Sequence, residues 1–195
     1  MLDIKEGQPM KSIVLYESRT GFSEKYAEWI AESLKCEAKP LRDFDPAGLE
    51  GCDTVVFGGG LHAVGIRGFR KFRRLMSLPG AKGKKVAVFA TGASPAREET
   101  LKHVRDANLS PEDRAQYGLF YMRGGFDFAR LQKIDKIAMT LLKLKIRLKS
   151  EKKRTADERG MLSAYAKPVD FTRKKNMRPL IDWLGVLPGA HDKPE

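Results

Sequence analysis

The sequence predicts an α/β fold in which a parallel sheet is covered by helices on both faces. Short apolar runs rich in β-branched residues alternate with segments whose apolar residues recur at helical spacing. The apolar runs are continuous, as expected for strands that are buried on both sides. With 195 residues, 42% of them hydrophobic, the chain is long enough for one well-buried domain and too short for two of full size. We therefore expect a single domain over residues 10–187, with a flexible extension at 1–9 and a flexible tail at 188–195.

Five strands and three intervening helices can be placed in chain order. The expected strands lie at residues 12–16, 38–41, 53–58, 85–91 and 118–122, and the second of them is the weakest. The expected helices lie at residues 23–34, 68–78 and 95–107. Pro95 suits a first helical turn, and Pro79 with Gly80 ends the preceding helix. Strands that alternate with helices in this way are expected to pair in parallel.

The spacing of apolar residues indicates which faces of two helices are buried. In the arginine-rich helix at 68–78, Phe69, Phe72 and Leu75 are expected to point inward while the cations stay in water. A closing helix at 176–187 is expected to pack on the sheet through four apolar side chains, Leu180, Ile181, Trp183 and Leu184.

After the fifth expected strand the pattern changes. Residues 124–160 are about as long as a strand and helix unit but lead to no further strand, so we expect a helical insertion there. The formal net charge of +12 is concentrated in this part of the chain. Residues 122–178 contain 17 Lys and Arg against 6 Asp and Glu, whereas the remainder has 20 against 19. The charge favours an anionic partner that meets the C-terminal third.

The insertion is expected to contain a basic amphipathic helix. At 100° per residue, one face carries four cations, Lys133, Lys136, Lys143 and Arg147, and most of the remaining arc is apolar. One interpretation is a helix packed against the domain with its cations in water; the other is a surface helix that docks on anionic lipid. The stretch "LKLKIRLK" also alternates with period two, which leaves a local strand open. Binding to nucleic acid is the weaker expectation, because no base-stacking motif or recognition helix accompanies the charge.

The remaining composition points to a cytoplasmic protein. Cys36 and Cys52 lie far apart with no metal or redox spacing, so we expect reduced thiols and no metal site. The N-terminus has no basic and apolar signal pattern, and no uncharged apolar run approaches the roughly 18 residues that span a bilayer. Any membrane association is therefore expected to be peripheral, at the inner face.

The stretch "ESRTGFS" at 17–23 connects the first strand to the first helix. Gly21 lets the backbone turn closely, while the hydroxyls of Ser18, Thr20 and Ser23 and the first helical amides can donate to a phosphate. The patterns of dinucleotide and triphosphate loops are absent, so a monophosphate is the better expectation. The alternative is that the hydroxyls only cap the helix.

This loop resembles the flavodoxin phosphate loop, Ser/Thr-x-Thr-Gly-x-Ser/Thr, in its usual place after the first strand. From Met10 to about Leu184 the chain is more particularly similar to the bacterial quinone-linked protoporphyrinogen oxidases of flavodoxin type. Three features carry this resemblance: Arg19 within the loop, "VVFGGGLHAVGIRGFRKF" after the third strand, and the basic insertion. The resemblance implies a flavodoxin-like sheet of order 2-1-3-4-5 that holds FMN without a covalent bond.

The resemblance also implies which residues form the site. The phosphate would be held by Ser18, Arg19, Thr20, Gly21, Phe22 and Ser23. The flavin ring would lie between two further loops, at Gly59, Gly60, Leu61, His62 and Ala63 and at Thr91, Gly92, Ala93 and Ser94. His62 is expected to contact the ring, and no catalytic residue is assigned. Substrate propionates would meet Arg123, Arg130 or Lys133.

Three functions remain open from the sequence. The first is an FMN-dependent oxidoreductase that passes electrons from a small molecule, by resemblance protoporphyrinogen, to a quinone. The second is a flavodoxin-type electron carrier without its own substrate, although its positive charge would require acidic partners. The third is a membrane or nucleic-acid adaptor that has lost the flavin. Fold alone does not decide among them.

Overall fold

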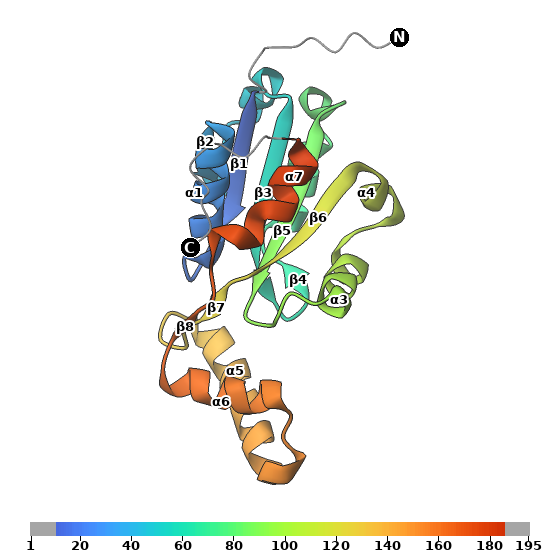
Figure 1. The fold of residues 1–195 in the computed structure, drawn as a ribbon. Coiled ribbons are helices and arrows are strands. Elements are labelled where there is room, and N and C mark those ends of the chain that lie inside the picture. Colours follow the sequence, from blue (N-terminus) through green and yellow to red (C-terminus); the bar gives the residue numbers. More distant parts are fainter. Residues whose placement is uncertain (1–10, 186–195) are drawn as a thin grey trace.

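The computed structural model describes residues 11–185 and contains a central sheet flanked by helices (Figure 1). The five parallel strands are β1 (Ser12–Glu17), β2 (Glu37–Pro40), β3 (Thr54–His62), β5 (Lys85–Gly92) and β6 (Tyr117–Arg123). They lie in the order β2-β1-β3-β5-β6, which confirms the expected order 2-1-3-4-5. The expected extension at 1–9 and tail at 188–195 lie outside the described residues.

Helices cover both faces of this sheet. The helices of the main domain are α1 (Phe22–Leu34), α2 (Phe69–Met76), α3 (Glu98–Asn108), α4 (Pro111–Gln116) and α7 (Arg178–Leu184). Short 3₁₀ turns lie at Leu41–Asp43, Pro46–Gly51, Pro79–Ala81, Glu151–Lys153 and Lys174–Met177. Helix α4 was not expected, although its capping box is visible in the sequence as Ser110 followed three residues later by Asp113.

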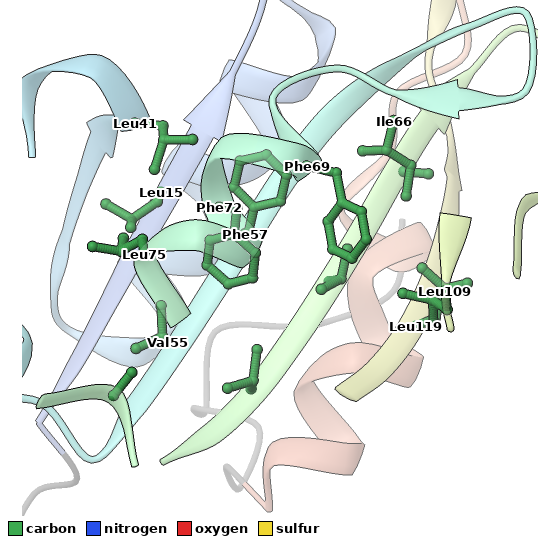
Figure 2. Close-up of a cluster of buried hydrophobic side chains, with 14 of the residues drawn as sticks. Leu15, Leu41, Val55, Phe57, Ile66, Phe69, Phe72, Leu75, Leu109 and Leu119 are labelled. Atoms are coloured by element: carbon green, nitrogen blue, oxygen red, sulfur yellow. The ribbon is translucent and has the colours of Figure 1, made fainter. Parts of the chain in front are cut away.

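One core layer lies between the sheet and helix α2. Phe69, Phe72 and Leu75 point inward as expected, and Phe72 is fully buried. Its ring stacks on that of Phe57 from β3, with 4.6 Å between ring centroids. Figure 2 shows these rings together with aliphatic side chains from β1, β3 and β6.

The second core layer lies on the opposite face, under α1 and α7. Neighbouring strand residues divide between the two layers, so that Val56 belongs to this one and Phe57 to the other. Leu180, Ile181 and Leu184 of α7 are buried as expected. Trp183 lies at the margin instead: it is 40% exposed, and its ring contacts that of Phe120 with 5.9 Å between centroids.

The expected end of the third strand is wrong by four residues. We expected a loop from Gly59, but β3 continues to His62. The parallel neighbours β1 and β5 pair with it as far as Gly60, and its last two residues pair with the returning chain. Gly59 pairs with Glu17 of β1, and Gly60 pairs with Thr91 of β5. The chain then turns back as the short antiparallel strand β4 (Gly65–Ile66).

The insertion forms a separate arm at the carboxyl end of the sheet (Figure 1). It begins at β7 (Gly125–Phe126) and returns at β8 (Val169–Asp170), which pairs antiparallel with β7. Between them lie α5 (Lys133–Leu148) and α6 (Ala156–Ala166). The stretch "LKLKIRLK" is part of α5, which removes the strand alternative.

Candidate functional site at the carboxyl edge of the sheet

The turn between β1 and α1 has the geometry of an open anion cradle. Gly21 stands at the N-cap with φ +90°, a conformation that residues with a side chain rarely adopt. No side chain caps the helix at this position. The Ser18 hydroxyl instead accepts a hydrogen bond from the Gly21 amide at 3.1 Å. The hydroxyls therefore do not act as a simple helix cap, and the first helical amides face the loop with the positive end of the helix dipole.

Ser23 connects this turn to the neighbouring strand. Its hydroxyl lies 2.7 Å from that of Thr91 at the end of β5, and both residues are buried. A Cβ at Gly60 would lie 3.5 Å from the Ser23 oxygen and 3.8 Å from the Thr91 oxygen. The three loops expected to form the cofactor site therefore meet within a few ångströms of one another.

Arg130 from the insertion lies over the open face of the cradle. Its Nη1 donates to the Thr20 carbonyl at 3.3 Å, and the same atom would be 3.6 Å from a Cβ at Gly21. Its Nε pairs with Asp127 at 3.3 Å. The uncapped helical amides and the adjacent guanidinium are donors that suit a dianionic phosphate. Gly21 has no side chain that would block the approach of such a group. The residues present therefore fit the phosphate of FMN.

The loop after β5 is held in place from β6. The Tyr121 hydroxyl donates to the Ser94 carbonyl at 2.9 Å, and burial raises the pKa of Tyr121 to about 12, so the hydroxyl remains a donor at neutral pH. Arg123 donates from Nε to the Ala93 carbonyl at 3.1 Å, and its guanidinium lies 3.6 Å from the centre of the Phe171 ring. Arg123, expected to meet substrate, is thus engaged in shaping the loop, whereas Lys133 is exposed at the start of α5.

The turn after β3 is shaped by packing within the protein. A Cβ at Gly59 would lie 2.4 Å from the Arg67 carbonyl oxygen, so this glycine permits the return of β4. Ala63 has φ +53°, and the Leu61 side chain lies 3.3 Å from the Cβ position of Gly92. Gly59 and Leu61 thereby fix the shape of the turn and its contact with the loop after β5. His62 is half exposed at the tip.

A cluster around Asp135 was not expected from the sequence. This carboxylate, at the first turn of α5, lies 2.6 Å from Arg67 Nη2, 3.0 Å from His62 Nδ1 and 3.5 Å from Arg19 Nη1. The cluster joins the phosphate loop, the turn after β3 and the insertion. Sequence patterns could not indicate this cluster, because its partners are separated by up to 116 residues. Within residues 11–185, no group of His, Cys, Asp and Glu side chains is suited to hold a metal ion.

Helix α5 presents an apolar stripe to solvent. Five large side chains are between 57% and 82% exposed: Ile134, Ile137, Leu141, Leu144 and Leu148. The opposite side of the helix packs toward α6, where the Tyr165 hydroxyl donates to the Met139 carbonyl at 2.5 Å and Lys143 lies over the Tyr165 ring. No helix in the described part of the chain is long and apolar enough to cross a membrane.

The two cysteines contribute no reactive thiol near this edge. Both are free, and burial raises the pKa of Cys36 to about 11. A thiol with such a pKa is neutral and a poor nucleophile at neutral pH.

Solved structures similar to this chain include three flavodoxin-type proteins. A flavodoxin from the domain Archaea has 14% sequence identity over 66% of this chain and 90% of its own, with a TM-score of 0.37. The flavodoxin, WrbA-like protein from Agrobacterium tumefaciens has 18% identity over 65% of this chain and 88% of its own, with a TM-score of 0.40. The two-electron reduced flavodoxin of Megasphaera elsdenii has 18% identity over 56% of this chain and 84% of its own, also with a TM-score of 0.40. No curated protein matches the chain in sequence.

The sequence pattern of the flavodoxin domain matches residues 13–154. This range includes the five parallel strands except Ser12, the three loops at their carboxyl ends and helix α5. The match therefore covers most of the chain and every loop of the candidate site. The chain belongs to the flavodoxin domain family, and FMN is the cofactor that this membership indicates.

Proposed function

We propose that this protein is an FMN-dependent oxidoreductase. The observation that carries the proposal is the cradle at residues 18–23, which is open at Gly21, faces Arg130 and adjoins the loops after β3 and β5. When bound, FMN supplies two-electron redox chemistry. Within this arrangement the α1 amides and Arg130 would hold the phosphate, while Tyr121 and Arg123 fix the backbone of residues 93 and 94, which would adjoin the ring.

The proposed substrate is protoporphyrinogen, and the proposed acceptor is a quinone. The resemblance described above supports this choice, as do the basic side chains around the site. Arg130 and exposed Lys133 are available at the edge of the insertion to meet substrate carboxylates. Arg123 has a smaller part in this proposal, because it already donates to Ala93 and lies against Phe171.

An oxidation assay tests the proposed function. We expect protein loaded with FMN to convert protoporphyrinogen to fluorescent porphyrin in the presence of menaquinone, faster than the enzyme-free reaction. Omitting the quinone under anaerobic conditions is expected to stop turnover after the bound flavin is reduced. Porphyrin formation no faster than the enzyme-free rate would contradict the proposed substrate. If the loaded protein instead exchanged electrons only with a reductase, the carrier alternative would replace it.

We further propose that α5 attaches the protein to anionic membranes, where a quinone is available. The exposed apolar stripe supplies the contact with acyl chains, and cations beside it, including Lys133 and Arg147, face the headgroups. Each such cation contributes about 1 kcal/mol near an anionic surface. The short length of the helix agrees with binding at the interface.

Vesicle flotation tests this attachment. We expect the protein to float with vesicles containing phosphatidylglycerol and to remain partly bound at high salt, because apolar contacts are not screened. Replacing Leu141 and Leu144 by Ser is expected to weaken binding by about tenfold or more, since each buried leucine contributes about 1.5–3 kcal/mol. The matched control replaces Leu142, which is half-buried toward the arm itself, by Ser. Equal binding by the two variants, or complete release by salt, would argue for electrostatic adhesion alone.

A further inference from the structure

Three basic side chains from outside the insertion surround the Asp135 carboxylate. Arg67 Nη2 approaches Oδ2 at 2.6 Å, with Arg19 Nη1 at 3.5 Å from the same oxygen, while His62 Nδ1 lies 3.0 Å from Oδ1. Both carboxylate oxygens are therefore contacted, from different directions. The Asp135 side chain is only 10% exposed and that of Arg67 18% exposed, so these charges interact with little screening by solvent.

The basic side chains and the acid come from different parts of the fold. Arg19 stands between Ser18 and Thr20 in the phosphate cradle, and His62 and Arg67 flank the turn after β3. Asp135 comes from the insertion, together with Gln132, which accepts a hydrogen bond from Arg19. The main domain outside the insertion thus provides basic side chains that suit a carboxylate, and the insertion provides the carboxylate.

The charges are not balanced within this cluster. Two guanidinium groups, which are always protonated, face a single carboxylate, and the imidazole of His62 lies 2.9 Å from Arg67 Nη2. An excess of positive charge remains after Asp135 is counted. Such a site attracts a further anion and can exchange one carboxylate for another of similar shape.

We propose that Arg19, His62 and Arg67 form a carboxylate-binding subsite beside the flavin, in which Asp135 is an internal ligand that exchanges with a carboxylate of the bound molecule. Binding at this subsite separates the start of α5 from the turn after β3. The subsite's place in a redox reaction rests on the proposed function, but its affinity for carboxylates does not.

Competition with Asp135 is expected to lower the affinity of the subsite for an external carboxylate by a defined factor. A ligand that must compete with an internal group binds with its intrinsic affinity reduced by the fraction of protein in which the subsite is open. Removing the carboxylate of Asp135 opens every copy. If the subsite is open about one-tenth of the time, the variant binds an external carboxylate about tenfold more tightly.

Calorimetric titration of the full chain with succinate tests this inference. The variants are Asp135→Ala and Asp135→Asn, the second of which keeps the shape of the side chain. The matched control is Asp157→Ala, which makes the same change of charge in the insertion at a side chain that is 62% exposed and pairs with Arg97 at 3.5 Å. A thermal melt of each protein establishes that it is folded.

We expect both Asp135 variants to bind succinate about tenfold more tightly than the wild type and the Asp157 control. Adding Arg67→Gln is expected to remove the gain. Equal affinity in the Asp135 and Asp157 variants, or a gain that survives Arg67→Gln, would overturn the inference. Inorganic phosphate whose affinity rises in the Asp135 variants as much as that of succinate would overturn its assignment to carboxylates.

The titration is performed with and without added FMN, which separates the two proposals. A gain in succinate affinity in a protein that takes up no flavin supports the subsite and contradicts the proposed function. Flavin binding without any gain in succinate affinity supports the proposed function and contradicts the proposed subsite.

Discussion

Replacing Gly21 by Asp is expected to lower the affinity for FMN by about a hundredfold or more, equivalent to a loss of about 3 kcal/mol of binding free energy. Two effects contribute. Gly21 has φ +90°, which strains any residue with a Cβ, and the new carboxylate would stand where the helix dipole and Arg130 favour a phosphate. Flavin fluorescence quenching on titration with FMN measures the change.

The matched control is Gly21→Asn, which has nearly the shape of Asp without its charge and tolerates positive φ better than most residues. We expect Asn to cost much less affinity than Asp. Equal losses would show that backbone strain alone is responsible and that no phosphate lies near this glycine. Unchanged affinity in both variants would place the flavin elsewhere and leave this loop as a connection between β1 and α1 without a ligand.

Replacing Gly58 by Ala is expected to destabilise the fold by about 3 kcal/mol, at the upper end of what overpacking usually costs. A Cβ at this position would lie 1.9 Å from Phe89 Cζ and 2.4 Å from two further ring atoms. Phe89 is fully buried in the layer under α1, and its ring contacts that of Tyr26 at 6.5 Å between centroids, so it has little room to move. Chemical denaturation followed by circular dichroism gives the free energy of unfolding.

A double-mutant cycle makes this prediction specific. Gly51→Ala, where a Cβ meets nothing within 4 Å, is expected to leave the free energy of unfolding within about 0.5 kcal/mol of the wild type. Phe89→Leu destabilises by itself, but in its presence Gly58→Ala should cost less, because the clashing ring is gone. Additive effects of the two substitutions would mean that Phe89 is not the cause.

The sheet could be predicted because each strand carries its evidence locally. Val56 and Phe57, for example, are adjacent apolar residues that enter opposite core layers, and such continuous runs indicate strands covered on both faces. The turn that forms the cradle was equally local, since a strand, a glycine with hydroxyl neighbours and a helix follow one another directly between residues 12 and 34. The expected end of β3 was wrong because its extension to Gly60 depends on pairing with Glu17 and Thr91, which are distant in sequence, and its last two residues depend on pairing with β4.

The contacts of the insertion could not be derived from its periodicity. Helical spacing identified the cations of α5 and its apolar arc, but it did not mark Asp135 as a residue of the site. Its burial depends on Arg19, His62 and Arg67, whose positions are set by the flavodoxin domain. Arg123 is a similar case, because its role follows from the placement of Ala93 and Phe171.

The pairing of β7 with β8 gives the arm a modular character. Gly125 lies opposite Asp170, and the Phe171 amide donates to the Gly124 carbonyl at 2.8 Å, so the chain leaves and rejoins the domain at nearly one point. What lies between these ends can change in length at little entropic cost, about 0.6 kcal/mol for each doubling of a flexible loop. The parallel sheet and the closing helix can thus be inherited unchanged while the arm is lengthened, shortened or exchanged, and with it whatever the protein recognises beside the flavin.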